Sequence, residues 1–310
     1  MTSSPPPKSG TIVHGIAIMT VAMLIVPSMD VLAKLLTRQM PAVEVAFARF
    51  VGQLLVSGVI GVALGQVREL IPPKPAGHFV RGLFLAATSL LFFSAIATMP
   101  LTDALAIAFA EPMILTAVSP IFLGETVGWR RWAACGVGFL GTLIIIRPSF
   151  EQFGATALLP LAGAFTFAGY HVMTRRLSGQ GSLTAVQFTA GLAGTVALGI
   201  ALAVTSAAGL LDRPVVWPND WGWAIFFGIG VLSYVTHGMI VTAFGHAPAA
   251  VLAPFGYLEI VSATTLSILV FGDVPDTPTI GGIALIVGSG LYIVHRERVR
   301  GRSREVPPAA

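Results

Sequence analysis

The chain has 310 residues, of which 55% are hydrophobic and only 10% are charged, with a formal net charge of +4. A soluble domain has about 25% charged residues, so this composition excludes an ordinary water-soluble protein. The single cysteine, Cys135, excludes a disulfide framework. No basic stretch is interleaved with aromatic residues, which argues against a nucleic-acid partner. We expect a membrane protein that holds no metal or other cofactor.

The first ten residues, MTSSPPPKSG, are polar and rich in proline, which predicts a disordered N-terminus. The apolar segment after them is too long for a signal peptide and contains Asp30 and Lys34, so we interpret it as the first membrane span. Ten apolar segments are long enough to cross a bilayer, and none shows the short alternation of a β-barrel. Their predicted ranges are 11–36, 42–65, 77–98, 101–123, 129–147, 154–176, 184–207, 220–244, 248–271 and 279–296.

The distribution of positive charge predicts the orientation of these spans, because Lys and Arg favour cytoplasmic loops. An even number of spans places both termini on the same side of the membrane. Thirteen of the 18 Lys and Arg residues then lie on that side, four lie on the other side, and Arg49 lies within a span. We therefore predict a multi-pass protein of the inner (plasma) membrane. Both termini are expected in the cytoplasm, and residues 297–310 form a basic cytoplasmic tail.

The chain repeats itself when the fourth span is laid on the ninth with a shift of 148 residues. The superposed pairs include Phe109 and Tyr257, Glu111 and Glu259, Gly124 and Gly272, and Glu125 and Asp273. Each repeat holds five spans, an odd number, so the second repeat enters the membrane from the opposite side. The fold class that follows is an all-α polytopic membrane protein of ten helices, built as two inverted five-helix repeats over residues 11–147 and 154–296. This architecture is common in transporters, whose substrate site lies near the membrane midplane.

A second and weaker match appears nearer the start of each half, with a shift of 141 residues. It pairs Lys34 with Arg175 and Asp30 with His171. The alternative explanation for this second match is chance.

In these features the chain resembles the drug/metabolite transporter superfamily, EamA branch. The resemblance rests on the ten spans, the two halves, and the "EP…SP…LGE" run that closes the fourth span and is echoed by "FGD" at Phe271–Asp273. It covers nearly the whole chain, and it implies a transporter. Similar members export amino acids or other metabolites, or import riboflavin or S-adenosylmethionine. One departure is Ile260, which stands where the first half has Pro112, so an opening of the helix at proline is not expected to be symmetric.

Glu111 and Glu259 lie about eleven residues into their spans, where an ionisable group costs about 2.5 kcal/mol or more and faces the bundle interior or a wet cavity. Pro112 removes a backbone donor and is expected to loosen the helix around Ala108. We interpret the two carboxyl groups as a central site that holds a cationic group of the substrate and exchanges protons. The alternative is that each glutamate is neutral and hydrogen-bonds a neighbouring helix.

Arg49 lies roughly two turns into the second span. It could bind a substrate carboxylate or phosphate through two hydrogen bonds, or it could form a fixed ion pair with Asp30 or Glu44. The sequence leaves these interpretations open. Lys34 lies near the end of the first span, and we expect its ammonium to reach the membrane interface.

His237 lies on the same helical face as Ser233, which permits a proton relay. The commoner role for such a histidine, and for His171, is a hydrogen bond to a neighbouring helix. Phe109 and Tyr257 stand two residues before the two glutamates and are expected to flank the cavity.

These features predict a secondary transporter and not an enzyme, because no HExxH, GxSxG or GxxxxGK[ST] motif is present. We expect alternating access, proton coupling, and efflux of a small polar or amphipathic metabolite such as an amino acid or a related zwitterion. The first alternative is uptake of a vitamin or nucleoside-like metabolite such as riboflavin or S-adenosylmethionine. The alternative of another class is a membrane receptor or scaffold. The expected partners are the metabolite and the lipid bilayer, and the protein is expected to be a monomer or a homodimer.

Overall fold

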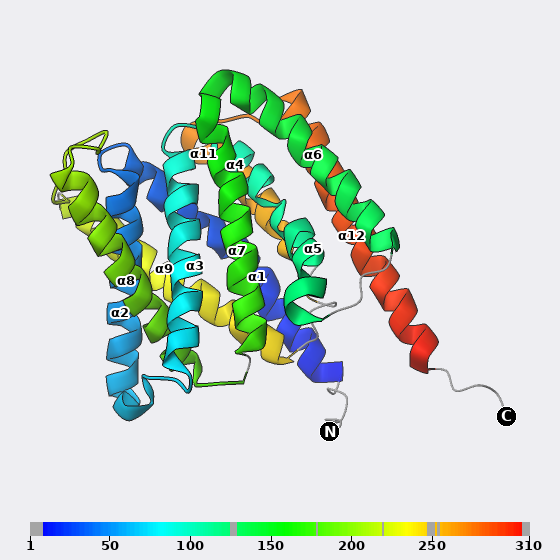
Figure 1. Ribbon diagram of the computed structural model, residues 1–310, viewed down its shortest axis with the longest axis horizontal. Helices are drawn as coiled ribbons and strands as arrows, with labels where there is room; N and C mark the ends of the chain where they lie inside the picture. Colours follow the sequence, from blue (N-terminus) through cyan, green and yellow to red (C-terminus); the bar gives the residue numbers. More distant parts are fainter. Residues whose placement is uncertain are drawn as a thin grey trace.

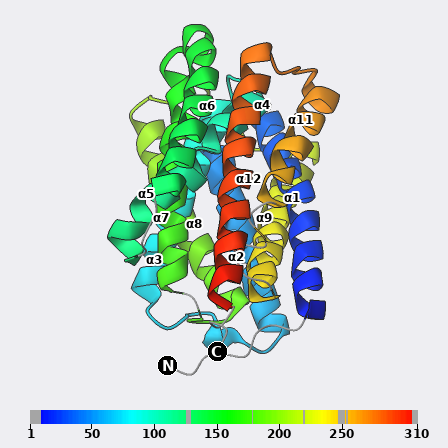
Figure 2. The same ribbon diagram turned by 90° about the vertical axis from the view of Figure 1, so that its right-hand side faces the viewer.

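The computed structural model describes residues 9–124, 129–177, 179–218, 220–246, 252 and 255–305. These residues are mainly helical and contain no strand. Successive long helices run in opposite directions and pack side by side as a bundle (Figures 1 and 2). Helix α1 begins and α12 ends at the same end of the bundle, here named the terminal end. The opposite end is named the far end.

The connections between the helices are short. Before residue 154 the helices are α1 (Ser9–Thr37), α2 (Ala42–Ala63), α3 (Pro75–Ile96), α4 (Leu101–Ala108), α5 (Glu111–Leu123) and α6 (Trp129–Phe153). The later helices are α7 (Leu159–Arg176), α8 (Leu183–Ala207), α9 (Asp220–His246), α11 (Leu258–Phe271) and α12 (Thr277–Glu305). Two short 3₁₀ helices, η1 (Val67–Glu69) and η2 (Gly154–Leu158), lie in the connections. Helix α12 therefore continues through residues 297–305 of the predicted tail.

Among the described residues, 7 segments are long and apolar enough to cross a membrane. One of them, Trp132–Arg176, covers most of α6 and all of α7. Two shorter apolar helices, Leu258–Phe271 and Thr277–Ser289, follow later in the chain. The prediction of an all-α protein with several membrane spans is confirmed.

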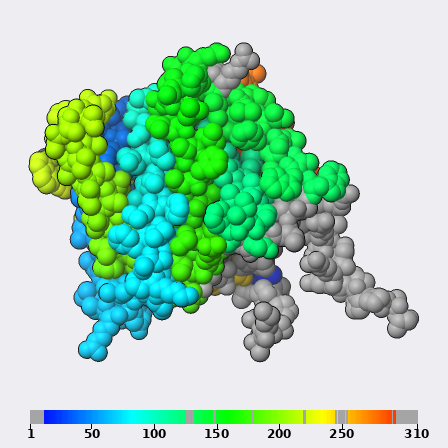
Figure 3. Space-filling view, in the orientation of Figure 1, coloured from blue at the N-terminus to red at the C-terminus, as the bar shows by residue number. Residues whose placement is uncertain are grey.

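The outer surface of the bundle is suited to lipid. Large apolar side chains are exposed along it, including Val59, Ile121 and Leu269, which are 68%, 76% and 75% exposed. Figure 3 shows one such face, on which α3, α7 and α5 lie side by side. The chain has 5 tryptophans, and they lie near the starts of α6 (Trp129 and Trp132) and α9 (Trp217, Trp221 and Trp223). Helix α9 starts at the far end, whereas α6 runs toward the far end from its start, so the two groups of tryptophans lie at different levels of the bundle.

The most extensive helix contacts join the two parts of the chain on either side of residue 154. Helix α2 packs on α8, α1 on α9, α3 on α7, and α6 on α12. Helix α5 packs on α7, and α11 packs on α1. The main apolar core lies between these helices and includes Phe50, Phe93 and Ile229. Neither part of the chain therefore buries its apolar surface alone.

Helices α2 and α9 cross at a pair of glycines. A Cβ atom added to Gly52 would lie 2.7 Å from the Cα of Gly230, which is closer than real Cβ atoms approach backbone. Because both contacting groups are backbone, neither can move aside as a flexible side chain does. This crossing also brings α2 and α9 together where both carry polar side chains.

We expect Gly52→Ala to lower the free energy of unfolding by about 1–3 kcal/mol, because the added methyl overpacks the helix crossing. The matched control is Gly58→Ala on the same helix, where an added Cβ meets the Phe188 ring at 3.6 Å, an ordinary contact. Thermal unfolding of the two purified variants in detergent measures the difference. Equal melting temperatures for both variants would contradict the tight crossing.

Candidate functional site

The fourth apolar segment is broken at its centre. Helix α4 ends at Ala108, Phe109 and Ala110 form a turn, and α5 begins at Glu111. Pro112 lies in the first turn of α5, where its missing N–H has no helical partner to lose. The predicted loosening of the helix around Ala108 is therefore confirmed. Glu111 lies at the N-terminus of a half-helix, where the backbone dipoles favour negative charge.

The same break occurs in the ninth apolar segment. Helix α11 begins at Leu258 directly after a turn at Tyr257, and its first turn contains Glu259. Ile260 in place of a proline does not prevent this break. The two halves therefore differ in the proline, as the sequence shows, but both have an interrupted helix.

Glu111 pairs with a histidine of α7. Its Oε1 atom lies 2.8 Å from Nδ1 of His171, and the carboxyl group is buried. The His171 ring also packs on Phe167, with the ring centroids 4.5 Å apart. The sequence indicated that His171 bonds a neighbouring helix, but it did not identify Glu111 as the partner or His171 as part of the site. The one signal that could have found it is the weak match of His171 with Asp30.

Glu259 has acidic neighbours instead. Asp30 of α1 is buried, and both Asp30 and Glu111 lie within electrostatic range of Glu259. Ser262 of α11 donates to the carbonyl of Leu24 on α1 at 2.8 Å, which holds the two helices together. The two broken segments therefore place glutamates in equivalent positions, one hydrogen-bonded to a histidine and the other within electrostatic range of two carboxyl groups.

The aromatic residues at the two breaks meet. The ring centroids of Phe109 and Tyr257 lie 5.9 Å apart, with 32° between the ring planes. Glu111 lies within electrostatic range of the Tyr257 hydroxyl. The structure thus brings together the aromatic pair and the glutamates that the repeat singled out.

Arg49 lies buried between α2, α3 and α9. Its Nε donates to Ser233 Oγ at 3.1 Å, and its Nη1 donates to Ser89 Oγ. In the described part of the chain no ion pair joins Arg49 to Asp30 or Glu44, although Asp30 lies within electrostatic range. Glu44 instead accepts from the backbone N–H of Val216 at 3.4 Å. The direct partners of the guanidinium are therefore neutral, and the proposed ion pairs are not formed.

His237 completes the surroundings of Arg49. Its Nε2 lies 3.5 Å from Nη2 of Arg49, and its Nδ1 lies 3.0 Å from the carbonyl oxygen of Ser233. A guanidinium only donates hydrogen bonds, so Nε2 accepts and Nδ1–H donates to the carbonyl. This arrangement is that of a neutral imidazole that accepts from Arg49, and the proton relay through His237 stays a prediction.

Two glutamines extend this buried network to α8. Ser233 donates to Gln53 at 3.0 Å, and the amide of Gln53 donates to the carbonyl of Gln187 at 3.3 Å. Gln187 in turn donates to the carbonyl of Tyr234 at 3.2 Å. Neither glutamine was predicted from the sequence, because an uncharged polar residue within an apolar span gives little signal by itself.

Six ionisable residues are joined by these hydrogen bonds or lie within electrostatic range of one another, and they are named the central cluster: Asp30, Arg49, Glu111, His171, His237 and Glu259. His171 lies within electrostatic range of His237, which connects the Glu111 pair to the Arg49 network. Among the described residues, no group of three or more His, Cys, Asp or Glu side chains is arranged to hold a metal ion. The cluster contains both carboxyl groups and a guanidinium, which are ionisable groups of opposite sign.

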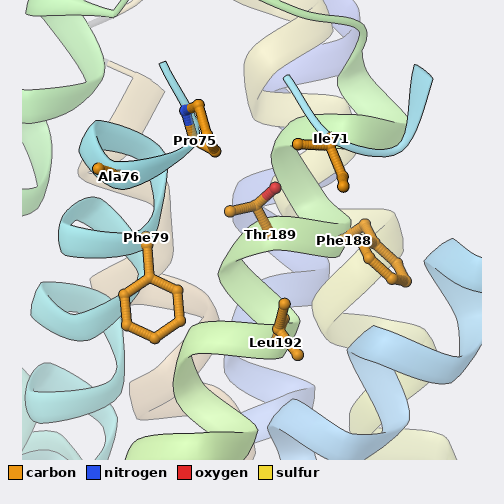
Figure 4. Close-up of a pocket in the computed structure, with 7 residues that line it drawn as sticks. All are labelled: Ile71, Pro75, Ala76, Phe79, Phe188, Thr189 and Leu192. Atoms are coloured by element: carbon orange, nitrogen blue, oxygen red, sulfur yellow. The ribbon is translucent and has the colours of Figure 1, made fainter. Parts of the chain in front are cut away.

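A separate pocket of about 310 Å³ lies between the start of α3 and α8 (Figure 4). Pro75 and Phe79 line one side, and Phe188 and Leu192 line the other. Its lining is almost wholly apolar, and Ile71 at its rim is strongly exposed. Such a pocket suits a lipid chain better than a polar metabolite, so we do not assign it to the site.

The sequence profile of the EamA-like transporter family matches residues 13–147 and 154–294. The chain belongs to the EamA-like transporter family. This EamA-like protein is therefore a transporter and not an enzyme, as its sequence motifs indicated. The family profile matches the chain twice, and one glutamate of the central cluster lies in each match.

Several characterised relatives of this EamA-like protein align over most of its length. The S-adenosylmethionine uptake transporter of Rickettsia bellii is 28% identical over 87% of this chain and 89% of its own. The riboflavin transporter of Vibrio cholerae is 28% identical, over 85% and 86%. The pseudopaline exporter CntI of Pseudomonas aeruginosa is 30% identical, over 90% and 94%. One solved protein structure superposes with a TM-score of 0.62 at 21% identity, covering 91% of this chain and 98% of the other, and it supports the fold.

Proposed function

We propose that this protein is an inner-membrane secondary transporter that carries a small zwitterionic metabolite by alternating access. Ten spans in two inverted halves would supply the movement, with both termini in the cytoplasm. The packing supports this proposal, because α5 lies on α7 as α11 lies on α1, which is the exchange that an inverted repeat produces. One chain supplies every residue of the central cluster, so a monomer is sufficient.

The observation that carries the proposed substrate class is the separation of charge within the central cluster. Glu111 and Glu259 offer carboxyl groups for a cation, whereas Arg49 offers a buried guanidinium with no direct carboxylate partner. The Phe109 and Tyr257 rings lie at the same two breaks and can stack on a planar group. A substrate with an amino-acid group and an aromatic ring satisfies all three features.

S-adenosylmethionine is the first candidate substrate. It carries an amine, a positive sulfonium, a carboxylate and an adenine ring, and a relative that covers most of this chain is named for its uptake. Riboflavin is the second candidate, because the aromatic pair suits a flavin and another relative is named for it. Efflux stays a prediction, since a carrier of this kind runs in the direction that the gradients set.

A thermal-stability screen of the purified protein tests this choice. A ligand at about 100 times its dissociation constant adds about 2.7 kcal/mol to the stability of the folded state. We expect a shift with S-adenosylmethionine and a smaller one with S-adenosylhomocysteine, which keeps the ring and the amino acid but lacks the sulfonium charge. A shift with riboflavin alone would replace the first candidate by the second. Equal stability shifts with both adenosyl compounds would show that the glutamates do not bind the sulfonium.

We further propose that the Glu111–His171 pair carries the coupling proton. A protonated Glu111 no longer attracts a cation, so proton and substrate compete for one carboxyl group. The titratable groups near this pair are Tyr257 and Glu259 on the side of Glu111, and His237 and Tyr170 on the side of His171. Competition at one group is the simplest way to exchange a proton for a substrate.

We expect His171→Gln to bind substrate within a few-fold of the unchanged protein but to lose accumulation driven by a pH gradient. Glutamine keeps a hydrogen bond to Glu111, but it cannot take up a proton. Substrate uptake into proteoliposomes, with and without an imposed pH gradient, measures the effect. The matched control is His246→Gln, because His246 lies away from the cluster and bonds the Thr242 carbonyl of its own helix. Gradient-driven accumulation that survives in His171→Gln would exclude this residue from proton coupling.

A further inference from the structure

Lys34, which the sequence predicted to reach the membrane interface, has partners within the protein. Its Nζ lies 2.7 Å from Oδ2 of Asp273 and 3.2 Å from the carbonyl oxygen of Met99. The ammonium also lies 4.6 Å from the centroid of the Phe271 ring. The side chains of Lys34 and Asp273 are only 11% and 28% exposed. This is an ion pair partly shielded from water, in which solvent screens the attraction less than it does at an open surface.

The ion pair ties together elements from both parts of the chain at the far end. Lys34 lies in the last turn of α1, and Asp273 follows the end of α11. A second contact reinforces the connection, because Thr279 of α12 donates to Asp103 of α4 at 3.1 Å. Arg38 also lies over the Phe271 ring, at 5.1 Å from its centroid. These contacts hold α1, α4, α11 and α12 together on the far-end side of the Phe109–Tyr257 pair.

An equivalent contact exists at the terminal end. Nε of Arg176, in the last turn of α7, donates to the carbonyl of Phe122 in the last turn of α5 at 3.1 Å. The internal match pairs Lys34 with Arg175, and it pairs the end of α5 with the end of α11. At the far end, a cation of α1, the first helix of the first half, thus binds the end of α11 in the second half. At the terminal end, a cation of α7, the first helix of the second half, binds the end of α5 in the first half. The two contacts differ in strength, since one is an ion pair and the other an exposed bond to a carbonyl.

From this geometry we propose that the Lys34–Asp273 ion pair is the gate at the far end of the transporter. Helices α1 and α4 both contact α11, and α4 contacts α12. We place the path between the central cluster and the far side between these elements. Those are the elements that the ion pair and the Thr279–Asp103 bond hold together. The ion pair breaks when this side opens and forms again when it closes. The inference rests on the proposed alternating access, and it assigns the residues that close one side.

A cross-linking experiment tests the gate directly. The single native cysteine is first removed by Cys135→Ala. Lys34→Cys and Asp273→Cys are then introduced together into this variant. A short bis-methanethiosulfonate reagent joins the two thiols, and a reductant releases them. We expect the joined protein to lose transport of S-adenosylmethionine, to keep its thermal shift with this ligand, and to regain transport after reduction. The single-cysteine variants are the controls: each has its own transport rate before treatment, and we expect the reagent and the reductant to leave that rate unchanged.

The outcomes separate failure of the gate from failure of the proposed function. Transport by the joined protein at the rate of the reduced protein would overturn the gate, because the far end would open with these positions tied. Absence of S-adenosylmethionine transport and binding in the unchanged protein would instead reject the proposed substrate. The cross-link is then read with riboflavin as the probe, so the gate is tested in either case.

A charge exchange gives an independent measurement. We expect Asp273→Lys alone to lower the transport rate by about tenfold or more, because like charges now face each other in place of a charge-assisted bond. The exchanged pair Lys34→Asp/Asp273→Lys restores the attraction and is expected to regain most of the rate. A double variant that is no better than the single one, while both elute as folded protein in size-exclusion chromatography, would also overturn the gate.

Discussion

Glu111→Gln is expected to abolish most transport while leaving the protein folded. Glutamine has nearly the same shape and can still hydrogen-bond His171, so the α5–α7 contact is retained. What is lost is the charge that attracts the substrate cation and the group that exchanges a proton. We expect the initial rate in proteoliposomes to fall by about 100-fold, which corresponds to about 2.7 kcal/mol.

The matched control for this variant is Glu69→Gln, which makes the same chemical change at an exposed position in η1. Its transport rate is expected to stay within about twofold, as for most surface substitutions. Glu259→Gln tests the second glutamate in the same assay. A Glu111→Gln variant that keeps the unchanged rate would show that the carboxyl group only packs against α7, which is the alternative that the sequence left open.

Arg49→Lys is expected to weaken binding of carboxylate-bearing ligands by about tenfold or more, because lysine keeps the charge but loses the planar fork of donors. The same change leaves Ser89 and Ser233 without their guanidinium partner, which costs about 1–3 kcal/mol of stability. Both effects follow from the same buried contacts. Equilibrium binding of S-adenosylmethionine and thermal unfolding measure them separately.

The comparison that decides between substrate binding and structure uses decarboxylated S-adenosylmethionine, which lacks only the carboxylate. We expect Arg49→Lys to weaken binding of the complete ligand but to leave binding of the decarboxylated one within about twofold. Equal weakening of both ligands would assign Arg49 to the structural network alone. His237→Gln serves as a control, since it changes an acceptor beside Arg49 without altering the number of buried charges.

The membrane helices and the break at Glu111 could be predicted because their causes are local. Apolar runs determine spans, and Pro112 interrupts the helix within a few residues of itself. The pairing of Glu111 with His171 and of Lys34 with Asp273 could not be predicted in this way, because 60 and 239 residues separate the partners. A single sequence carries no direct sign of such contacts.

The internal repeat gave only part of that information. It places Asp30 on His171 and Glu111 on Glu259, which are equivalent positions and not contact partners. The contacts cross between the halves, since α5 packs on α7 and α11 packs on α1. A repeat therefore identifies residues of the site, whereas the order in which the helices pack decides which of them touch.

The crossed packing of the halves has a consequence for how the protein is made. A ribosome delivers α5, with its buried carboxyl group, into the membrane before α7 has been synthesised, because His171 lies 60 residues after Glu111. Helix α11, which packs on α1 and carries Glu259, is synthesised later still after Asp30. During this interval each carboxyl group has to stay neutral or near the lipid headgroups, because a lone charge in hydrocarbon is costly. The later helices thus complete the folding of the earlier ones, and the site is complete only after α11 has been synthesised.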